Sequence, residues 1–73
     1  MSDLPDYDRK AMIKALRSVR SLDRFQAGGL ADIPPSRVQA TLATLIVDGL
    51  VFERLVDSVS RFSLTAAGKA AHQ

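Results

Sequence analysis

The chain contains no cysteine and no tryptophan, and it has one histidine among its 73 residues. Without cysteine, neither a disulfide framework nor a thiolate metal site can form, and the composition suits a reducing cytoplasm. No apolar run approaches the roughly 20 residues that a membrane-spanning helix needs, and no segment is typical of a signal peptide. We therefore expect a soluble, cytoplasmic protein with no membrane partner.

The groups that catalysis requires are also scarce. The single histidine, His72, is the penultimate residue, where chain ends fray. No carboxylate pair, nucleophile with a positioned base or cluster of metal ligands has a working spacing. Gly28-Gly29 lacks the preceding strand and downstream lysine of a phosphate-binding loop. The sequence therefore predicts a protein that is not an enzyme, with no catalytic residue, no metal site and no cofactor.

What is present describes an ordinary globular chain. Hydrophobic residues make up 47% of it, and its formal net charge is +2. We expect residues 1–73 to form a single domain, with no linker or repeat. Because this length is near the lower limit for a self-sufficient apolar core, a homodimer is also expected.

Two helices are predicted in the first part of the chain. The first spans about residues 6–21 and begins with acidic groups, which suit the positive start of a helix. Its apolar face comprises Ala11, Met12, Ala15, Leu16, Val19 and Leu22, and its basic face comprises Lys10, Lys14, Arg17 and Arg20. The second spans about residues 23–31, with Asp23 as its cap and with Phe25, Leu30 and the following Ile33 packing inward.

The second part of the chain predicts a helix, a hairpin and a short final helix. Pro34 and Pro35 set the start of a helix over about residues 35–48. Strands over about residues 50–56 and 59–64 are joined at Asp57-Ser58. Thr65 can then cap a helix over about residues 66–71. The predicted fold class is mainly α with a two-stranded β-hairpin (α+β), in the order helix, helix, helix, strand, strand, helix.

Two stretches in this order resemble a known family. They are "PPSRVQATLATLIVDGLV" at 34–51 and "RFSLTAAGKA" at 61–70. They are similar to the turn, third helix and wing of winged helix-turn-helix proteins, as in the MarR and PadR groups of transcription regulators. The resemblance implies a DNA-binding regulator whose third helix enters the major groove of double-stranded DNA while the hairpin, the wing, contacts the backbone.

The outward side of the third helix carries groups that can read bases. Arginine can bind guanine, glutamine can bind adenine, and small methyl-bearing side chains can contact thymine. The candidate DNA-binding residues on the helix are Ser36, Arg37, Gln39, Ala40 and Thr44, and on the wing they are Arg54 and Arg61. Phosphate contacts are expected from Lys10, Lys14, Arg17 and Arg24, and Arg9 and Arg20 are further candidates.

These residues also allow plainer interpretations. The basic stripe of the first helix can be a solvated face, and Arg54 and Arg61 can pair with Glu53 or Asp57. The four aromatic residues, Tyr7, Phe25, Phe52 and Phe62, are expected to pack in or near the core rather than stack on bases.

Two apolar residues are expected on the surface, Ile13 within the basic sector of the first helix and Val47 on the third. Scattered apolar residues are normal on a protein surface. The alternative is that one or both of these residues enter a dimer interface, which would place two recognition helices on a palindromic site. The alternative function is a winged-helix protein-interaction module, an adaptor or inhibitor that docks on a protein partner through the neutral face of the third helix. A DNA-binding protein would be associated with the nucleoid.

Overall fold

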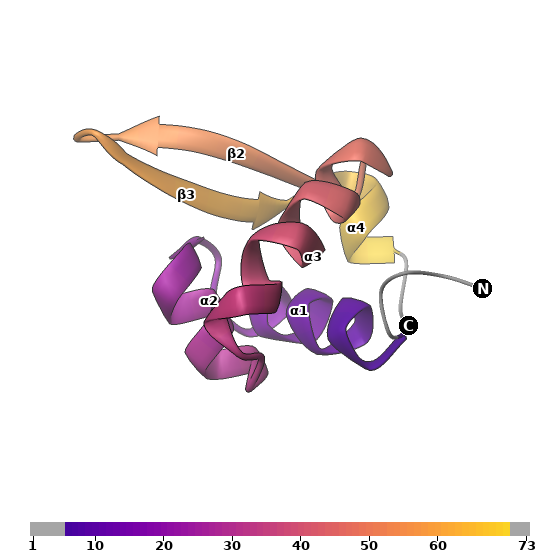
Figure 1. The fold of residues 1–73 in the computed structure, drawn as a ribbon. Helices are drawn as coiled ribbons and strands as arrows, with labels where there is room; N and C mark the ends of the chain where they lie inside the picture. Colours follow the sequence, from indigo (N-terminus) through magenta and orange to yellow (C-terminus); the bar gives the residue numbers. More distant parts are fainter. Residues whose placement is uncertain (1–5, 71–73) are drawn as a thin grey trace.

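The computed structural model describes residues 6–70 (Figure 1). Their elements are α1 (Asp6–Ser18), β1 (Leu22–Asp23), α2 (Arg24–Ala31), α3 (Pro35–Val47), β2 (Val51–Val56), β3 (Val59–Leu64) and α4 (Ala66–Ala70). The predicted fold class and order are confirmed, with one addition: β1 joins the hairpin in a three-stranded antiparallel sheet of order β1-β3-β2. Residue 71 of the predicted final helix and His72 lie outside the described residues.

The addition of β1 explains why α1 is shorter than predicted. Leu22 pairs with Phe62 and Asp23 pairs with Arg61, so both residues are extended. The chain must therefore leave the helix before them, and α1 ends at Ser18. Val19, predicted on the apolar face of the helix, lies beyond its end and is exposed.

The core lies between the three long helices and one face of the sheet. It contains Met12, Ile13, Ala15, Leu16, Leu22, Ala27, Ala31, Ile33, Val38, Leu42, Leu45, Val51, Phe62 and Leu64. The predicted exposure of Ile13 is wrong, because its exposed fraction is 1%. The prediction came from a helical-wheel projection that assumed one buried face, whereas α1 contacts α2, α3, β3 and α4 and so is buried on more than one side. Ile13 therefore cannot supply a dimer interface.

Helix α2 has the predicted cap but not the predicted inward face. The Gln26 amide donates to Asp23 Oδ1 at 2.7 Å, and the Gln26 side chain accepts from the Asp23 amide in a capping box. Phe25 is 74% exposed, and Leu30 is exposed as well, so their predicted inward packing is wrong. Small residues face the core instead: a Cβ on Gly28 would lie 2.6 Å from Val38 Cγ2, so the close approach of α3 requires glycine.

Helix α3 begins at the second proline, as the sequence indicates. Pro34 is the N-cap, and its carbonyl oxygen accepts from the Arg37 amide at 2.9 Å. Pro35 occupies the first turn, where a missing N–H leaves no bond unmade. After the helix, Gly49 adopts a φ of +78° and turns the chain into β2.

Thr65 joins the end of the sheet to α4. Its hydroxyl donates to the Gly49 carbonyl at 2.6 Å and accepts from the Gly68 amide at 3.0 Å. The predicted capping role of Thr65 therefore comes with a second role, because the same hydroxyl holds the turn before β2 against the start of α4. Gly68 is buried in this contact, and a Cβ there would overlap the carbonyl of Leu50. This close approach gives a physical reason for a glycine three residues after Thr65 in the stretch Leu64-Thr65-Ala66-Ala67-Gly68.

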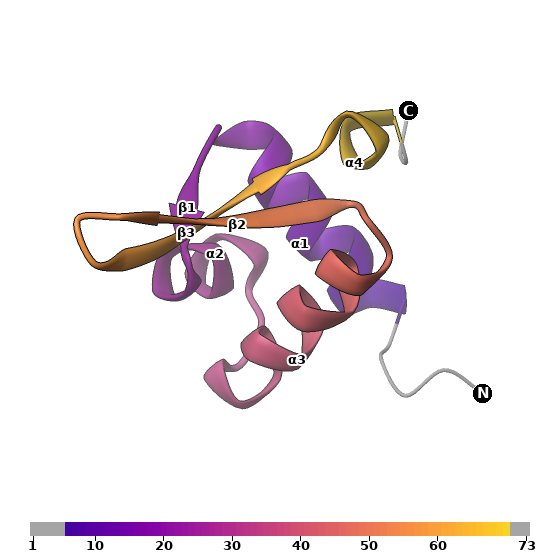
Figure 2. The same ribbon diagram turned by 90° about the horizontal axis from the view of Figure 1, so that it is seen from above.

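The wing is a hairpin with a two-residue turn. Val56 pairs with Val59, and the intervening Asp57 and Ser58 have φ values of +52° and +67°. Two successive positive φ angles define the type I′ turn that matches the twist of a hairpin. Figures 1 and 2 both show the hairpin projecting beyond the helices, and Figure 2 shows α3 and α4 on opposite sides of its base.

Candidate nucleic-acid interface

One side of α3 is buried and the other is open. Val38, Thr41, Leu42 and Leu45 form the buried stripe. The exposed residues are Ser36, Arg37, Gln39, Ala40, Ala43 and Val47, and Thr44 is half-buried. Val47 is 85% exposed. The outward side of the helix is therefore small and mostly neutral, and it permits close approach of a ligand.

Arg37 is engaged by the first helix of the same chain. Its Nε donates to Asp8 Oδ2 at 2.7 Å and its Nη2 donates to Asp8 Oδ1 at 3.3 Å. The Asp8 side chain is fully buried, whereas the Arg37 side chain is 47% exposed. The hydrogen bond to Asp8 raises the pKa of Arg37 above its ordinary value, against a smaller opposing effect of burial. Arg37 therefore ties α3 to α1 before any ligand is present.

Gln39 lies near the middle of the exposed side. Its Oε1 accepts from Arg24 Nη1 at 3.4 Å, which leaves the amide nitrogen out of this bond. Arg24 also lies over the ring of Phe25, 5.2 Å from its centroid. The Thr44 hydroxyl donates to the Ala40 carbonyl at 2.9 Å, so its methyl group and both oxygen lone pairs remain for a ligand. Arg24 is thus a cation that the structure places beside Gln39, one of the predicted DNA-binding residues.

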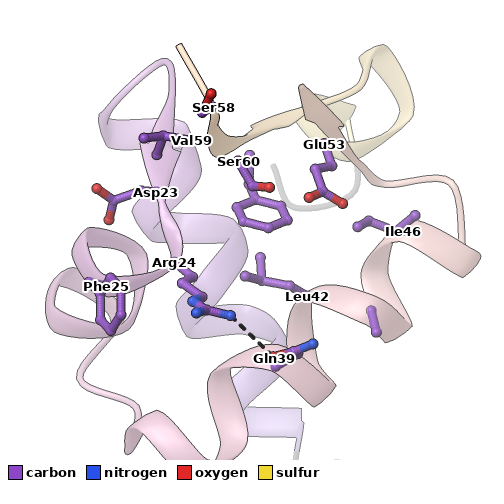
Figure 3. Close-up of a pocket in the computed structure, with 12 residues that line it drawn as sticks. Asp23, Arg24, Phe25, Gln39, Leu42, Ile46, Glu53, Ser58, Val59 and Ser60 are labelled. Carbon is purple, nitrogen blue, oxygen red and sulfur yellow. Dashed lines mark hydrogen bonds between the residues drawn. The ribbon is translucent and has the colours of Figure 1, made fainter. Parts of the chain in front are cut away.

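A hollow of about 410 Å³ separates α3 from the wing (Figure 3). Its walls are the start of α2, the outward side of α3 and the near face of the hairpin. The charged groups around it are Asp23, Arg24 and Glu53, two acidic and one basic. The side of the wing that faces α3 is therefore not a cationic surface.

The remaining predicted cations are dispersed. Arg9 pairs with Asp48 at 2.8 Å, and Arg17 donates to the carbonyl of Lys69 at 2.8 Å. Lys10 and Lys14 are exposed on α1. Of these groups, Arg9 contacts the C-cap of α3, Asp48, and the structure does not gather the others around it. Contact of these cations with phosphates stays a prediction.

The two wing arginines lie on the face of the sheet opposite to Phe62 and the core. They are directly paired across the hairpin, Arg54 with Arg61. Arg61 donates from Nε to Ser21 Oγ and from Nη2 to the Ser21 carbonyl, both at 2.9 Å. The alternative in which Arg61 pairs with Glu53 or Asp57 is wrong, because Glu53 faces the other side and Ser21 holds the guanidinium.

Aromatic packing is confirmed for Phe62 alone, which is buried. Phe25, Phe52 and Tyr7 are exposed, because alanine, glycine and aliphatic residues fill the small core.

Asp8 was not identified from the sequence as the partner of Arg37. The signal was available: Asp8 precedes Met12 by four residues and so shares its buried helical face, and a buried carboxylate needs a cation.

The three-helix arrangement, with a tight turn between α2 and α3 and a wing after α3, defines a winged helix-turn-helix fold. The chain is similar in structure to a MarR-family transcriptional regulator from Silicibacter pomeroyi, with a TM-score of 0.86 and 28% identity over 92% of this chain and 47% of that one. It is also similar to the PcaV transcriptional regulator of Streptomyces coelicolor (TM-score 0.86, 22% identity, 97% and 52% covered). A third similar structure is that of Bordetella bronchiseptica BpsR. Its TM-score is 0.83 and its identity 18%, over 93% of this chain and 50% of BpsR.

The chain therefore spans about half the length of the regulators it matches. No protein-family model and no curated protein matches the sequence. In the part of the chain that the structure describes, no helix combines the length and apolar character needed to cross a bilayer. Residues 6–70 also contain no group of three or more side chains placed to hold a metal ion.

Proposed function

We propose that this chain is the DNA-binding part of a transcription regulator and does not act as an enzyme. In this proposal α3 lies in the major groove, and Ser36, Gln39, Ala40 and Thr44 contact base edges. The observation that supports it best is the outward side of α3, which is uncovered and carries small residues around one glutamine. Glutamine can bind adenine through two hydrogen bonds, and alanine and threonine methyls can contact thymine.

The similar structures support the same proposal. Two of the similar structures named above are transcriptional regulators, and the DNA binding of the third, BpsR, is regulated by 6-hydroxynicotinic acid. As a regulator, this chain would act on the nucleoid in the cytoplasm. A homodimer remains part of the proposal, and with Ile13 buried its surface candidate is Val47.

The test uses a carboxylate placed on the proposed reading surface. Ala40→Glu would bring a negative charge against the phosphates and bases of the groove, and like charges in an interface cost several kcal/mol. We expect its affinity for a duplex selected from a random pool to fall by more than about tenfold, measured by fluorescence anisotropy.

Ala67→Glu is the matched control, because Ala67 is also an exposed alanine on a helix but lies on α4. It should bind the same duplex as the parent chain does. Equal affinities for Ala40→Glu and the parent would show that α3 is not the reading surface.

The variant Gln39→Ala then separates sequence-specific base contacts from sequence-independent binding of DNA. Loss of a bidentate contact to adenine should weaken binding to the selected duplex by about 1–3 kcal/mol and leave binding to random-sequence duplex unchanged. If both affinities fall together, Gln39 contributes no specificity.

A further inference from the structure

A second groove lies on the face of the wing that points away from α3. It has a volume of about 1010 Å³ and shares no lining residue with the hollow beside α3. Five of the ten lysines and arginines of the chain line it, and among residues 6–70 no aspartate or glutamate does. The cations come from four elements and the turn after α1: Arg17, Arg20, Arg54, Arg61 and Lys69. We call this surface the basic groove.

Part of this charge arrangement works against folding. Arg54 and Arg61 stand directly opposite each other on adjacent strands, and like charges in such pairs destabilise a hairpin. Arg61 is held in place by Ser21. The ion pairs Arg9–Asp48 and Arg37–Asp8 involve neither Arg20 nor Arg54. An anionic ligand would offset the repulsion, because it would be attracted by both guanidinium groups.

The floor of the groove indicates what kind of anion fits. Besides its cations, the groove is lined by three serines and by four apolar residues that we call its floor: Leu16, Phe52, Val56 and Leu64. Phe52 and Val56 are 44% and 40% exposed, so the floor is open to a ligand. A nucleic-acid backbone presents phosphates and sugars, whereas a peptide with alternating acidic and apolar residues presents carboxylates to the rim and hydrocarbon to the floor.

From this complementarity we propose that the basic groove binds an extended acidic and apolar segment of a partner protein. The groove and the outward side of α3 lie on different faces of the molecule, so one chain can hold DNA and the segment together. The segment would reach the groove alongside the hairpin, with carboxylates paired to Arg20 and Arg54 and an apolar side chain on Phe52. This inference does not depend on whether α3 reads DNA.

The probe is a fluorescein-labelled peptide that alternates Asp or Glu with Leu or Phe, titrated with the full chain at moderate salt. Its control is the same peptide with Asn and Gln in place of every Asp and Glu. We expect the acidic peptide to bind at least about tenfold more tightly than the amide peptide, because each carboxylate meets a guanidinium. Equal binding of the two peptides, or no binding of either, would overturn the proposal.

Two variants locate the site. The double variant Arg20→Gln/Arg54→Gln should bind the acidic peptide about tenfold or more weakly. It should keep the fold, since the loss of Arg54 removes the repulsion with Arg61. Arg24→Gln, an equal loss of charge beside α3, should leave peptide binding unchanged. If the double variant instead binds the peptide as the parent chain does and loses affinity for random-sequence duplex, the groove holds nucleic acid and the proposal is wrong.

Phe52→Ser should also lower the affinity for the peptide, because it removes the aromatic ring from the apolar floor.

Discussion

At the scale of single residues, two glycines with different surroundings show how the fold depends on close contacts. Gly68 is buried where α4 meets the end of α3, and a Cβ there would overlap the Leu50 carbonyl. Gly29 lies on the exposed side of α2, with nothing within 4 Å of an added Cβ. The sequence presents both simply as glycines within helical segments, so their difference is a tertiary one.

These surroundings give opposite predictions for the same substitution. Gly68→Ala should lower the free energy of unfolding by about 1–3 kcal/mol, because the backbone of α4 must move away from Leu50. Gly29→Ala should raise it by about 0.5–1 kcal/mol, because alanine favours a helix interior. Urea denaturation of both variants checks the pair. A neutral effect at Gly68 would show that α4 is not packed as closely as described.

At the scale of elements, the ion pair between Asp8 and Arg37 joins the first helix to the third. The residues are 29 positions apart, and one partner is fully buried. Breaking such a pair leaves a buried carboxylate without its cation, which is strongly destabilising. Arg37 was predicted from sequence as a base-reading group, and a loss of DNA affinity in Arg37→Ala would therefore mix a lost contact with a displaced helix.

A double-mutant cycle separates the two effects. Asp8→Asn and Arg37→Gln should each lower the Tm by several degrees, with Arg37→Gln the worse because it leaves the buried charge. The combined variant should recover much of the loss, since the pair is then neutral. If the two losses simply add, the residues are not coupled. The duplex affinity of the combined variant then reports whether Arg37 also contacts DNA.

The wing hairpin offers a second prediction for an element. Ser58 adopts a φ of +67° in the type I′ turn, a conformation that costs a residue with a side chain about 1 kcal/mol relative to glycine. Ser58→Gly should therefore stabilise the chain by up to about 1 kcal/mol in urea denaturation. Ser63→Gly, which lies within β3 and pairs with Phe52, is the control and should destabilise the chain. A loss of stability in Ser58→Gly would contradict the assigned turn.

At the scale of the whole molecule, half of the lysines and arginines gather in the basic groove, whereas the others are dispersed. Arg24 stands beside α3, whereas the basic groove lies behind the wing. Binding of DNA through α3 should therefore release few counterions. We expect the logarithm of the duplex affinity to fall with the logarithm of salt concentration with a slope of about −2 to −3.

Variants make this slope diagnostic. Arg24→Gln should make it shallower by about 1, and Arg54→Gln should leave it unchanged. A slope of about −6 or steeper in the parent chain would mean that the cations of the basic groove also contact the duplex. Anisotropy titrations at several salt concentrations measure all three chains.

The sequence by itself determined the order of the elements. Pro34-Pro35 and Gly49 bound α3, Asp23 and Thr65 cap their helices, and Asp57-Ser58 form the turn of the wing, because caps and turns depend on a few adjacent residues. The exposed side of α3 also followed from helical periodicity. Contact of those residues with DNA stays a prediction.

Only the tertiary structure decided which surfaces are left for ligands. It buried Ile13 beneath neighbouring helices, exposed Phe25 because glycine and alanine allow α3 to approach, and engaged Arg37 with Asp8. It also brought cations from α1, the wing and α4 into one groove. Each outcome depends on residues far apart in the chain, so local periodicity could not predict it.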